Sequence, residues 1–137
     1  MWFPAQAQSD GTVRLRGEAR LTLPDSAAAR VVERALQGTR CAVDLAENFS
    51  ALAWRKLLQN AVAGLMALAH RRSGVFSRAD IAGLALTYLC ECLAVARAES
   101  INLGEEVSQE ILGRFQLVPP DMSPSILTDR EAGRRLE

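Results

Sequence analysis

Apolar and polar residues alternate along residues 11–24 of the chain. This period of two is typical of a half-buried hairpin or a bent strand pair. Asp25 or Ser26 can then cap a helix that ends at Gly38, and a short strand is expected over residues 41–45. The apolar face of that helix holds Ala28, Val31, Val32, Ala35 and Leu36. The order of strand, helix and strand is typical of the end of an α/β domain.

The apolar period becomes helical at Ser50, which can act as an N-cap. The stripe that follows is expected to face the core: Leu57, Leu58, Val62, Leu65, Met66 and Ala69. Ser77 can cap a second helix, with Asp80 at its third position as in a weak capping box. The stripe of this second helix holds Ile81, Leu84, Ala85, Tyr88, Leu89, Cys92 and Ala96. Residues 50–137 are therefore predicted to be all α-helical.

Two further helices are expected in this part of the chain. The first is a shorter helix near residues 105–115. The second follows a loop rich in proline, with Ser123 as its N-cap and Pro124 as its first residue, and runs towards Glu137.

Composition narrows the class of protein. The chain has 137 residues and a mass of 14.9 kDa, enough for one sizeable core. Its 16 basic and 16 acidic residues form no block of like charge, so nucleic-acid binding is not expected. The apolar stretch over residues 51–69 is broken by Arg55, Lys56, Gln59 and Asn60, so no membrane span is expected.

The cysteines and the first residues favour a cytoplasmic protein. Cys41, Cys90 and Cys92 are odd in number and fit neither a disulfide framework nor a metal site. Residues 1–4 lack the basic start and the apolar stretch of a secretory signal. No Gly-x-Gly-x-x-Gly follows an opening strand, so the sequence has no dinucleotide-binding fingerprint.

Lys56 and Asn60 are the candidate functional pair. They stand four residues apart in an otherwise apolar helical run, so both side chains leave one face of the helix about one turn apart. Such a pair costs free energy on a buried helix unless the two groups find partners. The lysine can reach solvent and the asparagine can cap a neighbouring loop, or both can bind a ligand.

Five residues extend this pair to a seven-residue pattern that resembles the C-terminal half of the ketopantoate reductase (2-dehydropantoate 2-reductase) family. The agreement in order and spacing covers roughly residues 45–137. The matching residues are Trp54, Lys56, Asn60, Glu91, Ser125, Asp129 and Glu137. The chain departs from the family where Ile126 replaces a usual Met, where Pro124 precedes the serine, and where Ala98-Glu99-Ser100 replaces Ala-x-Gly. Gly64 and Gly74 stand where some members carry further asparagines. The loss of these asparagines affects which substrate is bound more than it affects the type of reaction.

The resemblance implies a mainly α fold. Residues 47–137 would be a helical domain of the 6-phosphogluconate-dehydrogenase-like type for substrate binding and dimerisation, truncated at its C-terminus. Residues 1–46 would be the small α/β tail of a nucleotide-binding domain. The implied enzyme reduces a small 2-oxo acid with NADPH, which a domain missing from this chain would hold, so the fragment alone would be inactive.

The resemblance also implies roles for four residues. The Lys56 ammonium would stabilise and protonate the carbonyl oxygen as charge develops, and Asn60 would orient the substrate. Ser125, in the first turn of the last helix, would bind the carboxylate. Glu137, a second catalytic residue about three turns further on if the helix continues, would bind a substrate hydroxyl.

Alternatives remain for the other polar residues and for the function. Glu91 either braces neighbouring helices or lies on the surface. His70, at a helix end, is expected to be a solvated or capping residue. Arg130, Arg134 and Arg135 either face a cofactor phosphate or form a surface set. The chain is either part of a reductase, which allows a homodimer, or a helical dimerisation module that has lost the chemistry.

Overall fold

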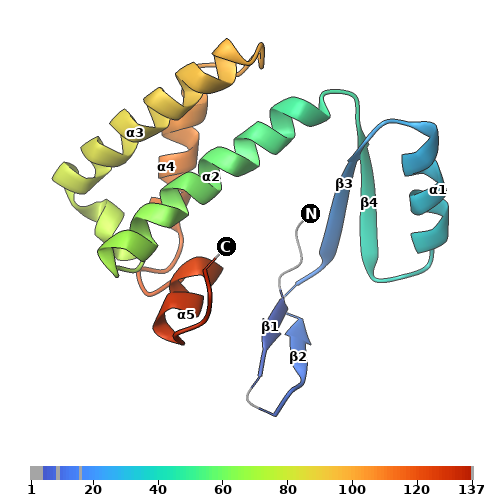
Figure 1. Cartoon of the computed structure of the whole chain (residues 1–137), viewed down its shortest axis with the longest axis horizontal. Coiled ribbons are helices and arrows are strands. Elements are labelled where there is room, and N and C mark those ends of the chain that lie inside the picture. The colour runs from blue at the N-terminus through green and yellow to red at the C-terminus, as the bar shows by residue number, and fades with distance from the viewer. Residues whose placement is uncertain (1–4, 9, 16, 137) are drawn as a thin grey trace. The chain divides into compact units, whose positions relative to one another are not determined.

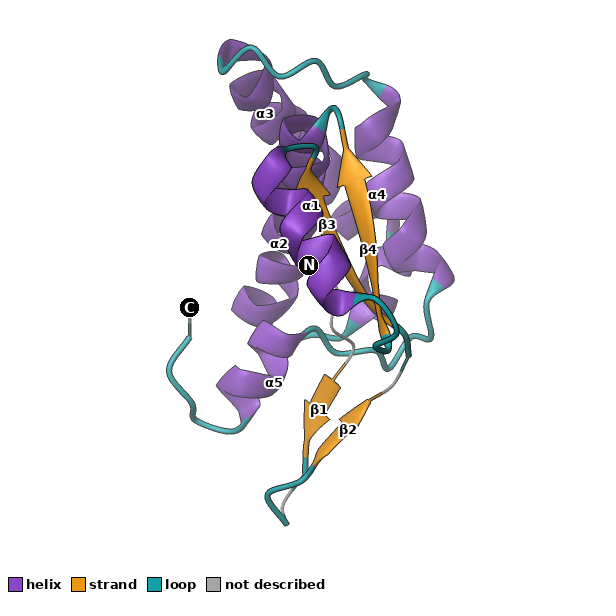
Figure 2. Ribbon diagram, turned by 90° about the vertical axis from the view of Figure 1, so that its right-hand side faces the viewer, coloured by secondary structure: helices purple, strands orange, loops and turns teal. Residues whose placement is uncertain are grey.

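The computed structural model describes residues 5–8, 10–15 and 17–136 (Figure 1). The chain divides into two compact units, residues 1–50 and 51–137. Strands occur only in the first unit among the described residues, and the long helices belong to the second (Figure 2). The predicted mainly α fold, with a small α/β part before it, is confirmed.

The first unit contains two separate strand pairs. Strands β1 (Ala5–Ala7) and β2 (Val13–Leu15) pair antiparallel, while β3 (Ala19–Pro24) pairs in parallel with β4 (Cys41–Ala46). The predicted strands are present, but their predicted pairing with each other over residues 11–24 is wrong. Alternation shows which face of a strand is buried, and it does not show which strand lies beside it.

Helix α1 (Ala27–Leu36) connects the two parallel strands. As predicted, Ser26 is its N-cap, because the Ser26 hydroxyl accepts a hydrogen bond from the Ala29 amide at 3.1 Å. The predicted apolar face differs from the buried one. The side chains of Val31 and Val32 are 56% and 39% exposed, and Ala29 is the buried residue of the helix. Two strands offer too little surface to cover the whole apolar stripe.

The second unit is all helical in its described residues. Helix α2 (Phe49–Ala69) begins two residues before this unit and forms its first helix. The 3-10 helix η1 (Ser73–Ser77), α3 (Ala79–Ala98), α4 (Glu106–Leu117) and α5 (Ser125–Glu131) follow.

Three predicted N-caps of this unit are wrong. Ser50 lies inside α2. Arg78 precedes α3 in place of Ser77, and Asp80 pairs with Arg78 at 2.8 Å. Ser123 lies one residue before the N-cap of α5, and its hydroxyl lies 3.2 Å from that of Thr128. In each of the three cases, the side chain that was expected to cap the helix lies at a different position in the helix or binds a different partner.

The core of the second unit joins α2, η1, α3 and α4. Its buried residues include Leu58, Val62, Met66, Phe76, Ala85, Leu89, Leu93, Ala96, Val107, Ile111 and Leu112. The predicted stripes therefore hold in part, since Leu57 and Leu84 are 54% and 60% exposed. Helix α3 is long and apolar enough to cross a membrane by length and composition. Four of its residues, Ala85, Leu89, Leu93 and Ala96, are buried in this core.

Candidate functional site

Lys56 and Asn60 lie on the face of α2 that points away from the core. Each stands two residues before a buried core residue, Leu58 or Val62, and therefore points about 200° around the helix from it. Both polar side chains are exposed. The desolvation cost expected for a buried pair therefore does not arise.

Ser125 is the exposed first residue of α5. Helix α5 ends at Glu131, and Gly133 has a positive φ of 64°. The prediction of a helix that continues towards Glu137 is therefore wrong, since glycine in this conformation ends a helix. A helix of seven residues has a small dipole, so the Ser125 hydroxyl is the main group available for an anion at this position. Glu137 lies outside the described residues.

The loop before α5 is fixed to the start of η1. The Ser73 amide donates to the Met122 carbonyl at 3.1 Å, and the Ser73 hydroxyl donates to the Pro119 carbonyl at 2.6 Å. The Gly74 amide donates to the Pro120 carbonyl at 2.9 Å. These bonds determine where the chain enters α5, and hence where Ser125 can lie.

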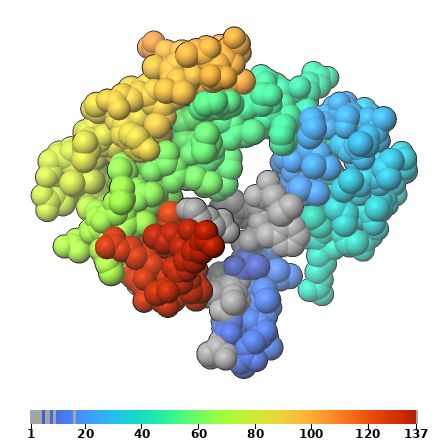
Figure 3. All heavy atoms as spheres, viewed as in Figure 1, coloured from blue at the N-terminus to red at the C-terminus, as the bar shows by residue number. Residues whose placement is uncertain are grey.

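Helix α5 is also attached to the C-terminal end of α2. A guanidinium nitrogen of Arg130 donates to the carbonyls of Ala67 and Leu68, the latter at 3.1 Å. Arg72 lies 3.4 Å from the Glu131 carboxylate, and His70 Nε2 lies 3.8 Å from it. The space-filling view shows α5 directly against the last part of α2 (Figure 3).

The structure thus places three of the four predicted site residues on two attached helices of one unit. Lys56 and Asn60 share one face of α2, and Ser125 begins the helix that is bound to its end. The prediction that all four side chains share one cleft stays a prediction.

The other predicted residues have structural partners or lie on the surface. His70 has a positive φ of 53° at the end of α2, which fits the predicted helix-end role. Arg130 binds carbonyls of α2, and Arg134 pairs with Asp129 at 2.6 Å, so both guanidiniums are engaged within the protein. Glu91 is exposed on α3 and forms no ion pair within the described ranges. This favours the surface role over the bracing role.

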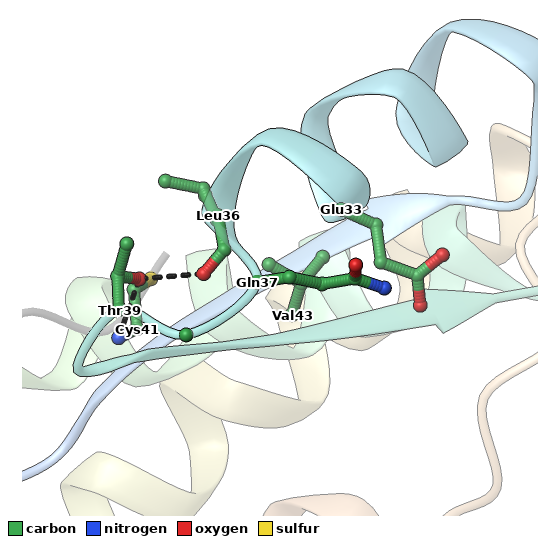
Figure 4. A pocket seen from close by; sticks show the side chains of 7 residues that line it. Glu33, Leu36, Gln37, Thr39, Cys41 and Val43 are labelled. Atoms are coloured by element: carbon green, nitrogen blue, oxygen red, sulfur yellow. Dashed lines mark hydrogen bonds between the residues drawn. The ribbon is translucent and has the colours of Figure 1, made fainter.

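One hollow, of about 230 Å³, lies between the end of α1 and the start of β4 (Figure 4). Its lining consists of Glu33, Leu36, Gln37, Gly38, Thr39, Cys41 and Val43. The Thr39 hydroxyl donates to the Leu36 carbonyl at 2.7 Å and accepts from the Cys41 amide at 3.2 Å. These bonds close the turn between helix and strand, and none of the predicted site residues lines this hollow.

The turn between β3 and α1 does not fit a dinucleotide phosphate. The described turn contains no glycine. The Ser26 hydroxyl already accepts a hydrogen bond from one of the amides at the helix N-terminus, that of Ala29. The Asp25 carboxylate lies at the same end and binds Arg30 at 2.7 and 2.8 Å. A carboxylate at this position repels an anion that would otherwise use the helix N-terminus.

Residues 48–137 match the family described as "Ketopantoate reductase PanE/ApbA C terminal". Among curated relatives, the 2-dehydropantoate 2-reductase of Mycobacterium tuberculosis is 47% identical over 137 residues, which is 100% of this chain and 46% of the relative. That of Caulobacter vibrioides is 25% identical over 135 residues, 98% of this chain and 47% of the relative. The chain thus spans about half the length of the curated relatives it matches.

Solved structures show the same fold. A dimeric ketopantoate reductase from Staphylococcus aureus superposes with a TM-score of 0.92 at 23% identity, over 99% of this chain and 48% of that protein. A PanE/ApbA family ketopantoate reductase from Ralstonia eutropha superposes with a TM-score of 0.76 at 27% identity, over 98% of this chain and 45% of that protein.

Proposed function

The chain belongs to the ketopantoate reductase family, and we propose that it provides the substrate-binding and catalytic half of an NADPH-dependent 2-dehydropantoate 2-reductase. The observation that carries the proposal is the exposed Lys56–Asn60 pair on α2, in a chain that is 47% identical over its whole length to a 2-dehydropantoate 2-reductase. In this proposal residues 47–137 are the substrate and dimerisation domain, and residues 1–46 are the tail of the nucleotide-binding domain.

Lys56 is proposed to act at the carbonyl of the 2-oxo acid. Reduction of a carbonyl places negative charge on its oxygen, which then takes up a proton to become a hydroxyl. An ammonium beside that oxygen stabilises the charge and supplies the proton. The Asn60 amide, one turn further along the same face, can orient the substrate with a neutral hydrogen bond.

Ser125 and Glu137 are proposed to bind the two ends of the substrate. The Ser125 hydroxyl can donate to the carboxylate of the 2-oxo acid, and the Glu137 carboxylate can accept from a hydroxyl at the other end. The β3–α1 turn does not form a phosphate site, so NADPH is assigned to a nucleotide-binding part outside the described residues. We assign the enzyme to the cytoplasm.

A fusion to the amino-terminal half of the Mycobacterium tuberculosis relative tests this function. This fusion, called here the fusion reductase, supplies the half that the relative has and the chain does not match. It is expected to oxidise NADPH with ketopantoate, and a panel of other 2-oxo acids measures the specificity. A correctly folded fusion reductase with no turnover on any 2-oxo acid would contradict the proposal.

A second candidate function is a helical dimerisation module without chemistry. The glycines at positions 64 and 74, where some family members carry asparagine, favour it, because two substrate-binding amides are then missing. The dimeric state of the Staphylococcus aureus protein supports a homodimer in either case. Sedimentation of the chain at increasing concentration measures its self-association, and turnover by the fusion reductase separates the two functions.

A further inference from the structure

Arg130 connects α5 to the carbonyls that end α2. The last carbonyls of a helix have no partner within it and carry partial negative charge. At the end of α2, the His70 amide donates to the Ala67 carbonyl at 3.3 Å, and the Arg71 amide donates to the Met66 carbonyl at 3.0 Å. Arg130 adds a cationic donor to Ala67 and Leu68 from a helix more than sixty residues away in sequence.

The neighbouring residue of α5 makes a second attachment of opposite charge. The Glu131 carboxylate lies near Arg72 and His70, which follow α2 directly. Arg72 also donates to the Asp121 carbonyl at 3.0 Å, in the loop before α5. Leu127, on the same short helix, is fully buried. Helix α5 therefore has a buried anchor and two polar attachments to one segment of the chain.

Ala67, whose carbonyl Arg130 binds, stands on the face of α2 that carries the candidate pair. Ala67 is eleven residues after Lys56, which is about three full turns of the helix. The two side chains therefore point in directions that differ by about 20° around the helix axis. Ala67 is buried, whereas Lys56 and Asn60, nearer the start of α2, are exposed. Ser125 is five residues before Arg130, about 8 Å along the axis of α5.

We propose that Arg130 is a positioning residue that holds Ser125 in place relative to Lys56 and Asn60. This role rests on the proposed function, because Ser125 is the group assigned to the substrate carboxylate. In this proposal Arg130 touches neither substrate nor cofactor. It acts by fixing the position of α5, which carries Ser125. Its loss therefore weakens the binding of the 2-oxo acid and leaves the proton donor on α2 intact.

The kinetic test uses Arg130→Met in the fusion reductase. The KM for ketopantoate is expected to rise about tenfold, the scale of one lost hydrogen bond to a charged group, while the KM for NADPH and kcat change less than about twofold. Arg130→Lys keeps a cationic donor and should restore part of the loss. Arg134→Met is the matched control, because Arg134 pairs with Asp129 of α5 and makes no hydrogen bond to α2 in the described residues.

A double-mutant cycle separates positioning from general destabilisation. If Arg130 acts through Ser125, Arg130→Met added to Ser125→Ala has little further effect on the KM for ketopantoate. Additive effects of the two changes, or an equal loss for Arg134→Met, would overturn the proposed role.

Amide hydrogen exchange of the chain itself provides a measurement without turnover. Arg130→Met should increase exchange at the α5 amides of Leu127 and Thr128, which donate to Pro124, and leave the core amide of Leu89 protected. Unchanged protection of α5 would overturn the proposal. A different outcome is that α5 loses protection in Arg130→Met while the unsubstituted fusion reductase is inactive. That outcome would contradict both the proposed function and the role of Arg130 in substrate binding. Arg130 would then only anchor α5.

Discussion

Gly74 lies directly against Pro120. Its amide donates to the Pro120 carbonyl at 2.9 Å, and a Cβ atom at position 74 would lie 3.0 Å from the Pro120 Cβ and 3.1 Å from the Pro120 oxygen. Both contacts are tighter than most Cβ atoms tolerate, and one of them is with backbone. Any larger residue at position 74 would therefore need a different course of the loop that leads to α5.

We predict that Gly74→Ala destabilises the chain, whereas Gly64→Ala stabilises it. The new methyl at position 74 forces the loop to move, at a cost of about 1–3 kcal/mol in the free energy of unfolding. Gly64 lies inside α2, and apart from its chain neighbours and the backbone of the helix no atom lies within 4 Å of its Cβ position, so alanine there should add up to about 1 kcal/mol. Urea unfolding of the two variants measures both changes, and a stabilising Gly74→Ala would contradict the close contact.

The stability of α3 is predicted to depend on the ionisation of Asp80. A hydrogen bond from Arg78 lowers the pKa of Asp80 below its usual 3.8, and the acid stands in the first turn of α3. A lowered folded-state pKa gives stability that is present above pH 3.8 and is lost as the pH falls through the folded value. Asp80→Asn should therefore lower the melting temperature at pH 7 and have a smaller effect near pH 2.

The matched control for Asp80 is Asp10. Its pKa is also lowered, by the side-chain and backbone hydrogen bonds from Thr12, but it belongs to the β1–β2 turn. Asp10→Asn should leave the helical unit unchanged. If Asp80→Asn lowers the melting temperature equally at both pH values, the loss has a cause other than the carboxylate charge.

Some of this architecture follows directly from the sequence. The spacing of Leu58, Val62 and Met66 predicts the buried face of α2, because the period of 3.6 residues determines which side chains share a face. The same geometry predicts that Lys56 and Asn60 lie together. The prediction of a helix towards Glu137 overlooked the signal of Gly133, since glycine is common just after a helix.

Other parts depend on contacts that a residue pattern does not encode. The partner of β3 is β4, beyond a whole helix, although β2 is nearer in sequence. Arg130 binds the backbone carbonyls of Ala67 and Leu68, which any residue at those positions would offer. The sequence therefore predicts the helices and the candidate pair, but it does not predict how α5 is attached to α2.

The chain alone is predicted to bind NADPH weakly or not at all. The β3–α1 turn has no glycine-rich phosphate loop, and Asp25 stands at the helix N-terminus where a phosphate would bind. Calorimetric titration of NADPH into the chain should show little heat, and the fusion reductase, which contains the other half of the relative, should bind it. Tight binding to the chain alone would show a cofactor site within it.

The catalytic role of Lys56 is tested by Lys56→Ala in the fusion reductase. Loss of a proton donor or of a cation at the carbonyl oxygen lowers kcat by about two orders of magnitude or more. Lys56→Arg should restore little, because a guanidinium keeps the charge but does not release a proton in the working pH range. Arg114→Ala, at an exposed position of α4, removes the same charge from the helical unit and should leave kcat unchanged. Ser125→Ala should act mainly on the KM for ketopantoate. If Lys56→Ala retains full turnover while the fold is intact, Lys56 is not catalytic.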